Sequence, residues 1–158
     1  MSKTVGDFLV QRLYDWGARR IFGYPGDGIN GFLGALQRFD GKIEFVQARH
    51  EEMAAFMASA HAKFTGEVGV CMATSGPGAS HLITGLYDAK LDHVPVLAIA
   101  GQSPRAVRGG HYQQEMNLVR MFQDVADYVY ELETPFWALA MRMARSVRWR
   151  ICGGVSSS

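Results

Sequence analysis

The chain has 158 residues, enough for one domain with a hydrophobic core, and its 48% hydrophobic and 20% charged residues are typical of a globular protein. The net charge of +1 hides an asymmetry, because the first 135 residues carry 12 Lys and Arg against all 15 Asp and Glu, so no basic face for nucleic acid is expected within them. The sequence shows no apolar span of about 20 residues and no signal peptide, so we expect a cytoplasmic protein without membrane contact.

Hydrophobic periodicity predicts alternating helices and strands along the chain. The predicted helices run from a cap at Thr4 and Asp7 to Gly17, from a glycine-rich loop to about Phe39, from about Glu51 to Gly66, and within 75–92. The predicted strands cover 20–24, 43–47, 68–74 and 94–101. The last two strands are apolar on both faces, as central parallel strands are. We therefore predict an α/β fold, a doubly wound parallel sheet with helices on both faces.

Sheets of this kind bind ligands at the carboxyl ends of their strands. Four segments should lie at that edge, namely 24–26, 47–52, 73–78 and 100–104. We therefore expect the functional residues in these four segments.

The loop after the first strand imitates two diphosphate-binding motifs. Gly26, Gly28 and Gly31 spell G-x-G-x-x-G, but Asp27 would repel a pyrophosphate. The motif also needs a ribose-binding acid at the tip of the next strand, and Glu51 lies a few residues beyond that tip. The same loop contains GDG, yet "HEEMAAF" downstream lacks the Asn that would complete a metal's oxygen shell. A metal–diphosphate loop is therefore not predicted, and a nucleotide-binding Rossmann protein is kept as a weaker alternative. The glycines are also explained by a tight turn and close helix packing.

Glu51 and Glu52 are adjacent at the predicted start of a helix, about 100° apart around its axis, so they cannot share one task. A carboxylate there can simply complement the helix dipole. It can also exchange protons near neutral pH if it lies in a poorly solvated cleft. Both interpretations stay open from spacing alone.

Five motifs follow in order: "YPG" (24–26), "RHEE" (49–52), "GVCMATSGPGASHLITGLYDA" (69–89), "DHVPVLAIAGQ" (92–102) and "QEMN" (114–117). With these motifs, about residues 3–133 of the chain resemble the N-terminal pyrimidine-binding domain of thiamine-diphosphate enzymes. Pyruvate oxidase and pyruvate:quinone dehydrogenase look most similar, and acetolactate synthase comes next.

The resemblance implies a catalytic role for Glu51. In the family, this glutamate hydrogen-bonds N1′ of the aminopyrimidine and drives the 4′-amino group to its imino form, which takes the proton from thiazolium C2. The cofactor-binding residues implied by the motifs are Tyr24, Pro25, Gly26, Glu51, Thr74, Gly76, Pro77, Gly78, His81 and Gln114. His50 is interpreted as an orienting or interface group, and no residue is predicted to bind a metal.

Two positions bear on which reaction the family member performs. His81 stands where oxidases often carry His and synthases often carry Asn, which favours the oxidase branch. Gln113 stands where the family usually has Phe, so an aromatic substrate wall is not expected. The reaction is therefore left open between the branches.

The resemblance also implies ligands and partners. Thiamine diphosphate would be bound by its pyrimidine half, and the substrate would be a 2-oxo acid such as pyruvate. Mg²⁺ and FAD would enter only through domains that these 158 residues do not contain. In the family the pyrimidine domain of one subunit meets the diphosphate domain of another, so we expect a homodimer, a higher oligomer or a separate diphosphate-domain chain. The alternatives are a non-catalytic binding or assembly module and an acetolactate-synthase-type carboligase.

The predicted domain ends at about residue 133, and 134–158 form a divergent basic tail. The tail has four arginines, no acid and a Gly/Ser end. Relatives would continue with a helix and a strand, so we expect a truncated or frame-disrupted product. A basic amphipathic segment for a partner or membrane surface is the alternative for this tail.

Overall fold

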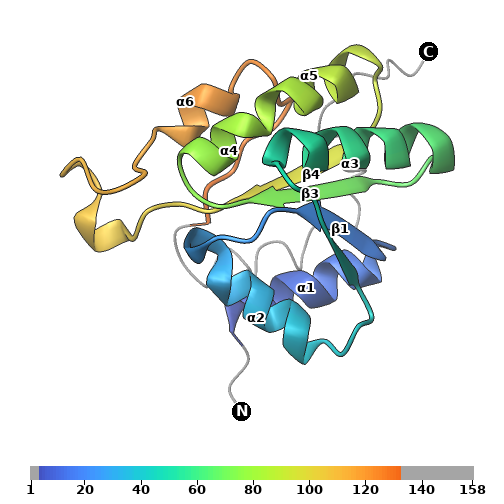
Figure 1. Ribbon diagram of the computed structural model, residues 1–158, viewed down its shortest axis with the longest axis horizontal. Coiled ribbons are helices and arrows are strands. Elements are labelled where there is room, and N and C mark those ends of the chain that lie inside the picture. The colour runs from blue at the N-terminus through green and yellow to red at the C-terminus, as the bar shows by residue number, and fades with distance from the viewer. Residues whose placement is uncertain (1–3, 133–158) are drawn as a thin grey trace.

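The computed structural model describes residues 4–132, so the predicted tail 134–158 lies outside the described residues (Figure 1). Within this range four parallel strands form one sheet in the order β2-β1-β3-β4. The strands are β1 (Arg20–Gly23), β2 (Glu44–Gln47), β3 (Gly69–Ala73) and β4 (Val96–Ala100). The predicted parallel α/β sheet is confirmed.

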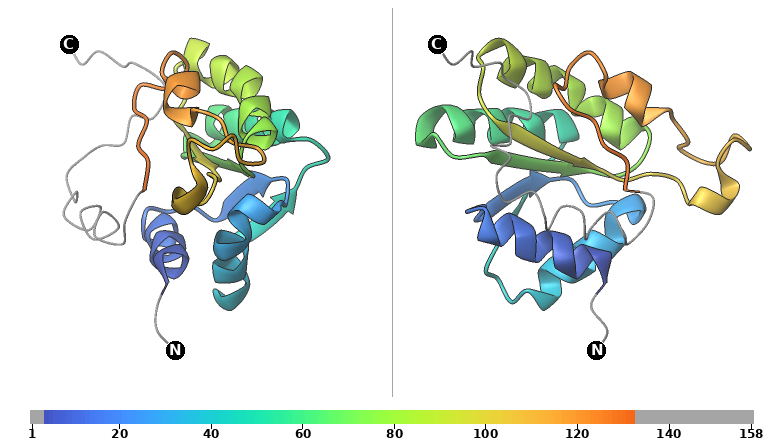
Figure 2. Two further views of the ribbon diagram at one scale, coloured as in Figure 1. Left: turned by 90° about the vertical axis from the view of Figure 1, so that its left-hand side faces the viewer. Right: turned by 180° about the vertical axis from the view of Figure 1, so that it is seen from behind.

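Helices cover both faces of the sheet, as the doubly wound prediction requires (Figures 1 and 2). One face carries α1 (Val5–Asp15) and α2 (Asn30–Arg38), which pack on each other. The other face carries α3 (Glu51–Thr65), α4 (Pro77–His81), α5 (Ile83–Leu91) and α6 (Leu118–Phe122). Two short 3₁₀ turns, η1 (Asp27–Ile29) and η2 (Arg105–Val107), follow β1 and β4.

The winding of the chain reverses between β1 and β3. From β1 the chain passes to β2 on one side, and β3 then returns to pair with β1 on the other side, with Gly23 opposite Met72. The loops that follow β1 and β3 therefore leave the sheet side by side. In open α/β sheets this switch point is where ligands bind.

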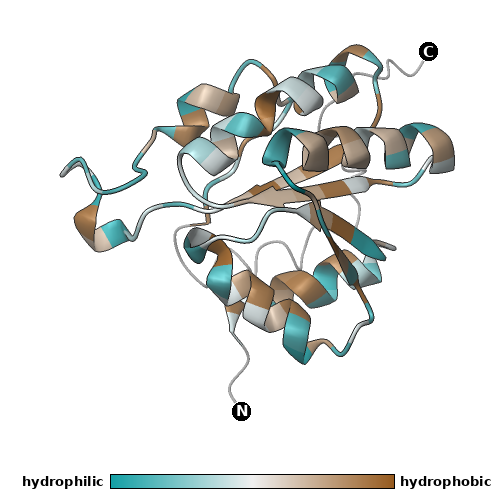
Figure 3. Cartoon of the chain, in the orientation of Figure 1, coloured by the Kyte–Doolittle hydropathy of each residue, from teal (hydrophilic) through white to brown (hydrophobic). Residues whose placement is uncertain are grey.

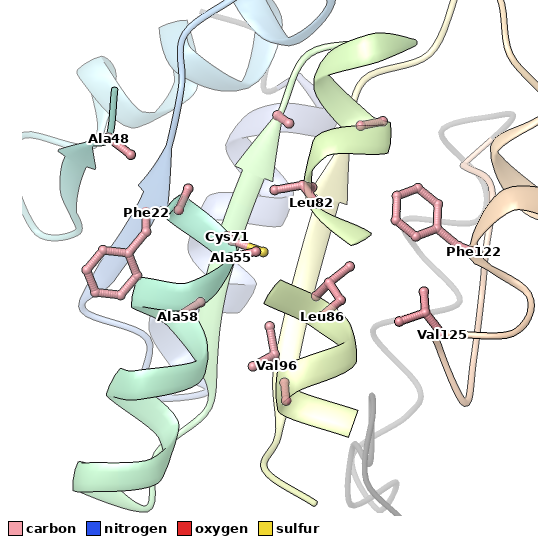
Figure 4. Packing of buried hydrophobic residues seen from close by; sticks show 14 of the residues in the cluster. Phe22, Ala48, Ala55, Ala58, Cys71, Leu82, Leu86, Val96, Phe122 and Val125 are labelled. Atoms are coloured by element: carbon pink, nitrogen blue, oxygen red, sulfur yellow. The ribbon is translucent and has the colours of Figure 1, made fainter. Parts of the chain in front are cut away.

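The core between the sheet and α3 is built largely from alanine. Ala54, Ala55 and Ala58 are fully buried, and their small side chains let α3 approach both the strands and α5 closely (Figure 4). A second core lies under α1 and α2, where Val10, Ile21 and other aliphatic residues meet. In Figure 3 apolar residues accordingly predominate on the strands, whereas apolar and polar residues alternate along the helices.

The crossover helix predicted within 75–92 is two helices. The helix is interrupted at Leu82, where the amide of Leu82 donates to the carbonyl of Ala79 only three residues earlier. This hydrogen bond is of the tighter 3₁₀ type. The helix α6 is the other difference, because its five residues are too few for periodicity to reveal.

Within residues 4–132, no helix combines the length and the apolar character needed to cross a membrane.

Helix α1 begins with the predicted cap. The amide of Asp7 donates to Thr4 Oγ1 (3.1 Å), the amide of Thr4 donates to Asp7 Oδ2 (2.8 Å), and Arg38 of α2 contacts Asp7 Oδ1 at 2.6 Å. The hydrogen bonds from the Thr4 backbone and hydroxyl, followed by the one from Arg38, lower the pKa of Asp7 from 3.8 to about 2. The stabilisation by the ionised carboxylate is therefore present above pH 3.8 and lost as the pH falls through about 2.

We expect Asp7→Asn to lower the Tm at pH 7, because the amide accepts these hydrogen bonds without a charge. The difference from the parent chain should shrink as the pH approaches 2, and thermal unfolding followed by circular dichroism measures both. Asp40→Asn is the matched control, since Asp40 has a φ of 57° that Asn tolerates. A Tm difference for Asp7→Asn that is equally large at both ends of this pH range would contradict the assignment.

Candidate functional site

The glycine loop after β1 packs against the turn after β3. The amide of Gly28 donates to Thr74 Oγ1 at 3.0 Å, and a Cβ at Gly26 would lie 2.5 Å from Thr74 Cβ. A Cβ at Gly31, in contrast, would meet open space, although the third glycine of a dinucleotide fingerprint is needed for close packing. The loop is therefore a packing surface for the neighbouring turn, and the geometry gives no support to the dinucleotide alternative.

The turn after β3 also holds Gln114 in place. Gly76 has a φ of +60°, and a Cβ there would lie 2.4 Å from the carbonyl oxygen of Gln114. The buried hydroxyl of Ser75 donates to Gln114 Oε1 at 3.1 Å. Ser75 is a site residue that sequence reasoning did not single out, and its place inside "TSGPG" was the available signal. These contacts bring the "QEMN" segment to the same edge of the sheet.

Glu51 is the first residue of α3, and its side chain is 10% exposed. His50 caps the helix, because its Nδ1 accepts a hydrogen bond from the amide of Glu52 at 3.3 Å. The orienting or interface role expected of His50 stays a prediction. Glu51 thus lies at the N-terminus, the positive end of the dipole, of a 15-residue helix.

Each oxygen of the Glu51 carboxylate has a defined neighbour. Oε2 lies 2.9 Å from Nδ1 of His81, at the end of α4. A Cβ at Gly78 would lie 3.3 Å from Oε1 and 2.7 Å from Thr74 Cγ2, so the glycine keeps side-chain atoms away from that oxygen. An acid held in this way can exchange a proton with a group that approaches it.

The imidazoles of His50 and His81 lie beside each other over this carboxylate. Their ring centroids are 4.5 Å apart with a 30° tilt, and Nε2 of His50 is 4.0 Å from Glu51 Oε2. Both side chains are about half exposed, at 48% and 45%. The largely buried carboxylate therefore lies next to two half-exposed histidines.

The fold brings most of the predicted site residues together. Thr74, Gly78 and His81 surround Glu51, whereas Gly26 reaches this group through Thr74, and Gly76 contacts Gln114. The remaining three predicted residues lie in the same two turns, Tyr24 and Pro25 directly after β1 and Pro77 at the start of α4. Whether any of the ten predicted residues contacts a ligand stays a prediction.

Residues 3–121 match the family model for the thiamine pyrophosphate enzyme, N-terminal TPP binding domain. The chain belongs to this family. Among the relatives of this thiamine-pyrophosphate-binding domain, a thiamine-pyrophosphate-containing protein YdaP of Bacillus subtilis is 48% identical over 132 residues, 84% of this chain and 23% of the relative. Pyruvate oxidase of Lactiplantibacillus plantarum is 45% identical over 123 residues, 78% of this chain and 20% of the enzyme.

Acetolactate synthase of Arthrospira platensis is a third relative of this TPP-binding domain, 41% identical over 138 residues, 85% of this chain and 24% of the synthase. The thiamine-pyrophosphate-binding domain therefore spans about a quarter or less of the length of these relatives. The resemblance noted from the motifs is confirmed at the level of the family and its cofactor, thiamine diphosphate.

Proposed function

We propose that this domain binds the aminopyrimidine of thiamine diphosphate and that Glu51 is the acid that exchanges a proton with N1′ of that ring. The observation that carries the proposal is the placement of one largely buried carboxylate at the switch point of the sheet. Its Oε2 is held by His81, and Gly78 places no side chain against Oε1.

The residues present fit such a ring. Gly78 adds no side-chain bulk beside Glu51 Oε1, and a flat ring needs such close approach of the backbone, whereas Gly26 and Gly76 make room for Thr74 and Gln114. When bound, thiamine diphosphate supplies the electron sink for cleavage next to the carbonyl of a 2-oxo acid. The part of this chain in that chemistry is to orient the pyrimidine, exclude water around Glu51 and hold the proton at its carboxyl.

The other predicted residues form the walls of the proposed site. Tyr24, Pro25 and Gly26 would line one side of the ring, and Thr74, Gly76, Pro77 and Gly78 would line the other. Gln114 is held by Ser75 and Gly76 at the same edge, where it can donate or accept hydrogen bonds. His81 would keep the Glu51 carboxyl in position.

For the whole protein we propose decarboxylation of a 2-oxo acid of the pyruvate oxidase or dehydrogenase type. The similarity to pyruvate oxidase and the histidine at position 81 support this choice, and the similarity to acetolactate synthase keeps carboligation as the second candidate. A complete site would further need Mg²⁺, a diphosphate-binding domain and, in an oxidase, FAD. A second subunit or a separate chain would supply the missing half of the site, and residues 1–133 would form the domain that meets it.

The cytoplasm is the compartment that we propose for the whole protein.

A chimera tests the proposal. Residues 3–121 would replace the matching segment of the Lactiplantibacillus plantarum pyruvate oxidase, which supplies the remaining domains. We expect the chimera to bind thiamine diphosphate and to exchange the thiazolium C2 proton in D₂O, measured by proton NMR. A folded chimera that binds the cofactor without faster exchange than free cofactor would count against the role of this domain.

A further inference from the structure

Three side chains with metal-binding atoms converge at the start of α3 and the end of α4. His50, Glu51 and His81 each offer one such atom, and these atoms all lie within 4.8 Å of one another. Glu51 Oε2 is 2.9 Å from Nδ1 of His81 and 4.0 Å from Nε2 of His50. Within residues 4–132, this is the one group of three such side chains. The fold creates it, because His81 is 30 residues away from Glu51 along the chain.

We propose that these three residues form a binding site for a divalent transition metal of the Zn²⁺ and Co²⁺ type. Two imidazole nitrogens and one carboxylate oxygen are a donor set that these ions prefer over Mg²⁺. Ligand bonds of about 2.0–2.2 Å in a tetrahedral site place the donor atoms about 3.3 Å apart. The 2.9 Å pair must open and the 4.0 Å pair must close, both by less than about 1 Å. The two imidazole nitrogens, which lie within 4.8 Å of each other, must close by up to about 1.5 Å, and side-chain torsions can supply these movements.

Coordination through the two rings relocates one proton on each. Nδ1 of His50 accepts the amide of Glu52 at 3.3 Å, and coordination through Nε2 places the ring proton on Nδ1, so this hydrogen bond is lost and the ring must turn away from the amide. Coordination through Nδ1 of His81 moves its proton to Nε2. Because the two histidines are about half exposed, a fourth position stays open to water.

A metal held here occupies the oxygen of Glu51 that His81 now contacts. A carboxylate that binds a divalent cation through Oε2 must stay ionised, so it cannot take up a proton from an aminopyrimidine at Oε1 either, and metal binding and cofactor activation exclude each other. This consequence rests on the proposed function, whereas the metal site itself rests on the donor geometry alone. Metal binding by the isolated chain therefore tests the site independently of the cofactor.

The experiment is a titration of the 158-residue chain, stripped with EDTA, with CoCl₂, followed by the visible absorption of the bound ion. We expect saturable binding of one equivalent with the absorption of a four-coordinate ion. Glu51→Gln and His81→Ala should each weaken binding at least tenfold, because each removes a ligand. His81→Asn is a second variant in case the alanine variant fails to fold, which far-UV circular dichroism reports.

Three variants serve as matched controls. Glu52→Gln changes the neighbouring carboxylate, and His93→Asn changes an exposed histidine whose φ of 54° suits Asn. Cys152→Ser removes a thiol that could bind cobalt. All three should bind Co²⁺ as the parent chain does. Lack of saturable binding by the parent, parent-like binding by the Glu51 and His81 variants, or loss of the absorption in Cys152→Ser would each overturn the proposal.

Discussion

Glu51→Gln in the pyruvate oxidase chimera is expected to slow exchange of the thiazolium C2 proton by about 10²–10⁴-fold, the range typical for loss of a general acid–base group. The amide keeps the shape of the glutamate and can still contact His81. It cannot take up and release the proton that the pyrimidine nitrogen requires. Exchange into D₂O, quenched with acid and read by proton NMR, measures the effect directly.

Glu52→Gln is the control for this prediction, because it removes the adjacent charge at the same helix start and leaves Glu51 intact. The chimera with Glu52→Gln should exchange within a few-fold of the unsubstituted chimera. If Glu51→Gln binds thiamine diphosphate and also exchanges at the unsubstituted rate, Glu51 is not the activating acid. Such a result would leave the metal site untouched, because that site is tested on the isolated chain.

Gly76→Ala is expected to lower the free energy of unfolding by about 3 kcal/mol. Two effects add up at this position. The backbone has a φ of +60°, which L side chains rarely adopt, and the new Cβ would lie 2.4 Å from the carbonyl oxygen of Gln114 and 2.9 Å from its Cα. Because these neighbours are backbone atoms, a change of rotamer cannot relieve the contact. Urea unfolding monitored by circular dichroism gives the difference.

Gly31→Ala is the matched control, since Gly31 lies in α2 and a Cβ there meets open space. Gly31→Ala should not lower the free energy of unfolding and can raise it by up to about 1 kcal/mol, because alanine is the better helix former. Equal stabilities for the Gly76→Ala and parent chains would show that the turn after β3 relaxes freely. The conclusion that this turn fixes the position of Gln114 would then be wrong as well.

Local sequence patterns were sufficient to predict most of the fold. The cap at Thr4 and Asp7, the stop at Gly66 and the apolar strands around Cys71 and Val96 follow from side-chain chemistry that acts within a few residues. These features predicted the alternation of helices and strands and hence the doubly wound sheet. The break at Leu82 escaped prediction, because both halves of the crossover have the same helical periodicity.

Motif order likewise placed Glu51, Thr74, Gly78 and His81 among the site residues before their positions in space were known. The order of the motifs did not predict which residues these side chains contact. The contact of His81 with Glu51, the hydroxyl of Ser75 on Gln114, and the packing of Gly26 against Thr74 join segments that lie 30 to 48 residues apart.

Such contacts depend on the strand order β2-β1-β3-β4, which sets the loops after β1 and β3 side by side. The glycine loop shows the difference most clearly. Its glycine pattern resembles a phosphate-binding loop. From the sequence, the only argument against that interpretation is that the other residues of such a motif are missing. Its actual neighbour is Thr74, because parallel pairing of β1 with β3 brings the two turns into contact, and a sequence motif carries no information about which distant residue will face it.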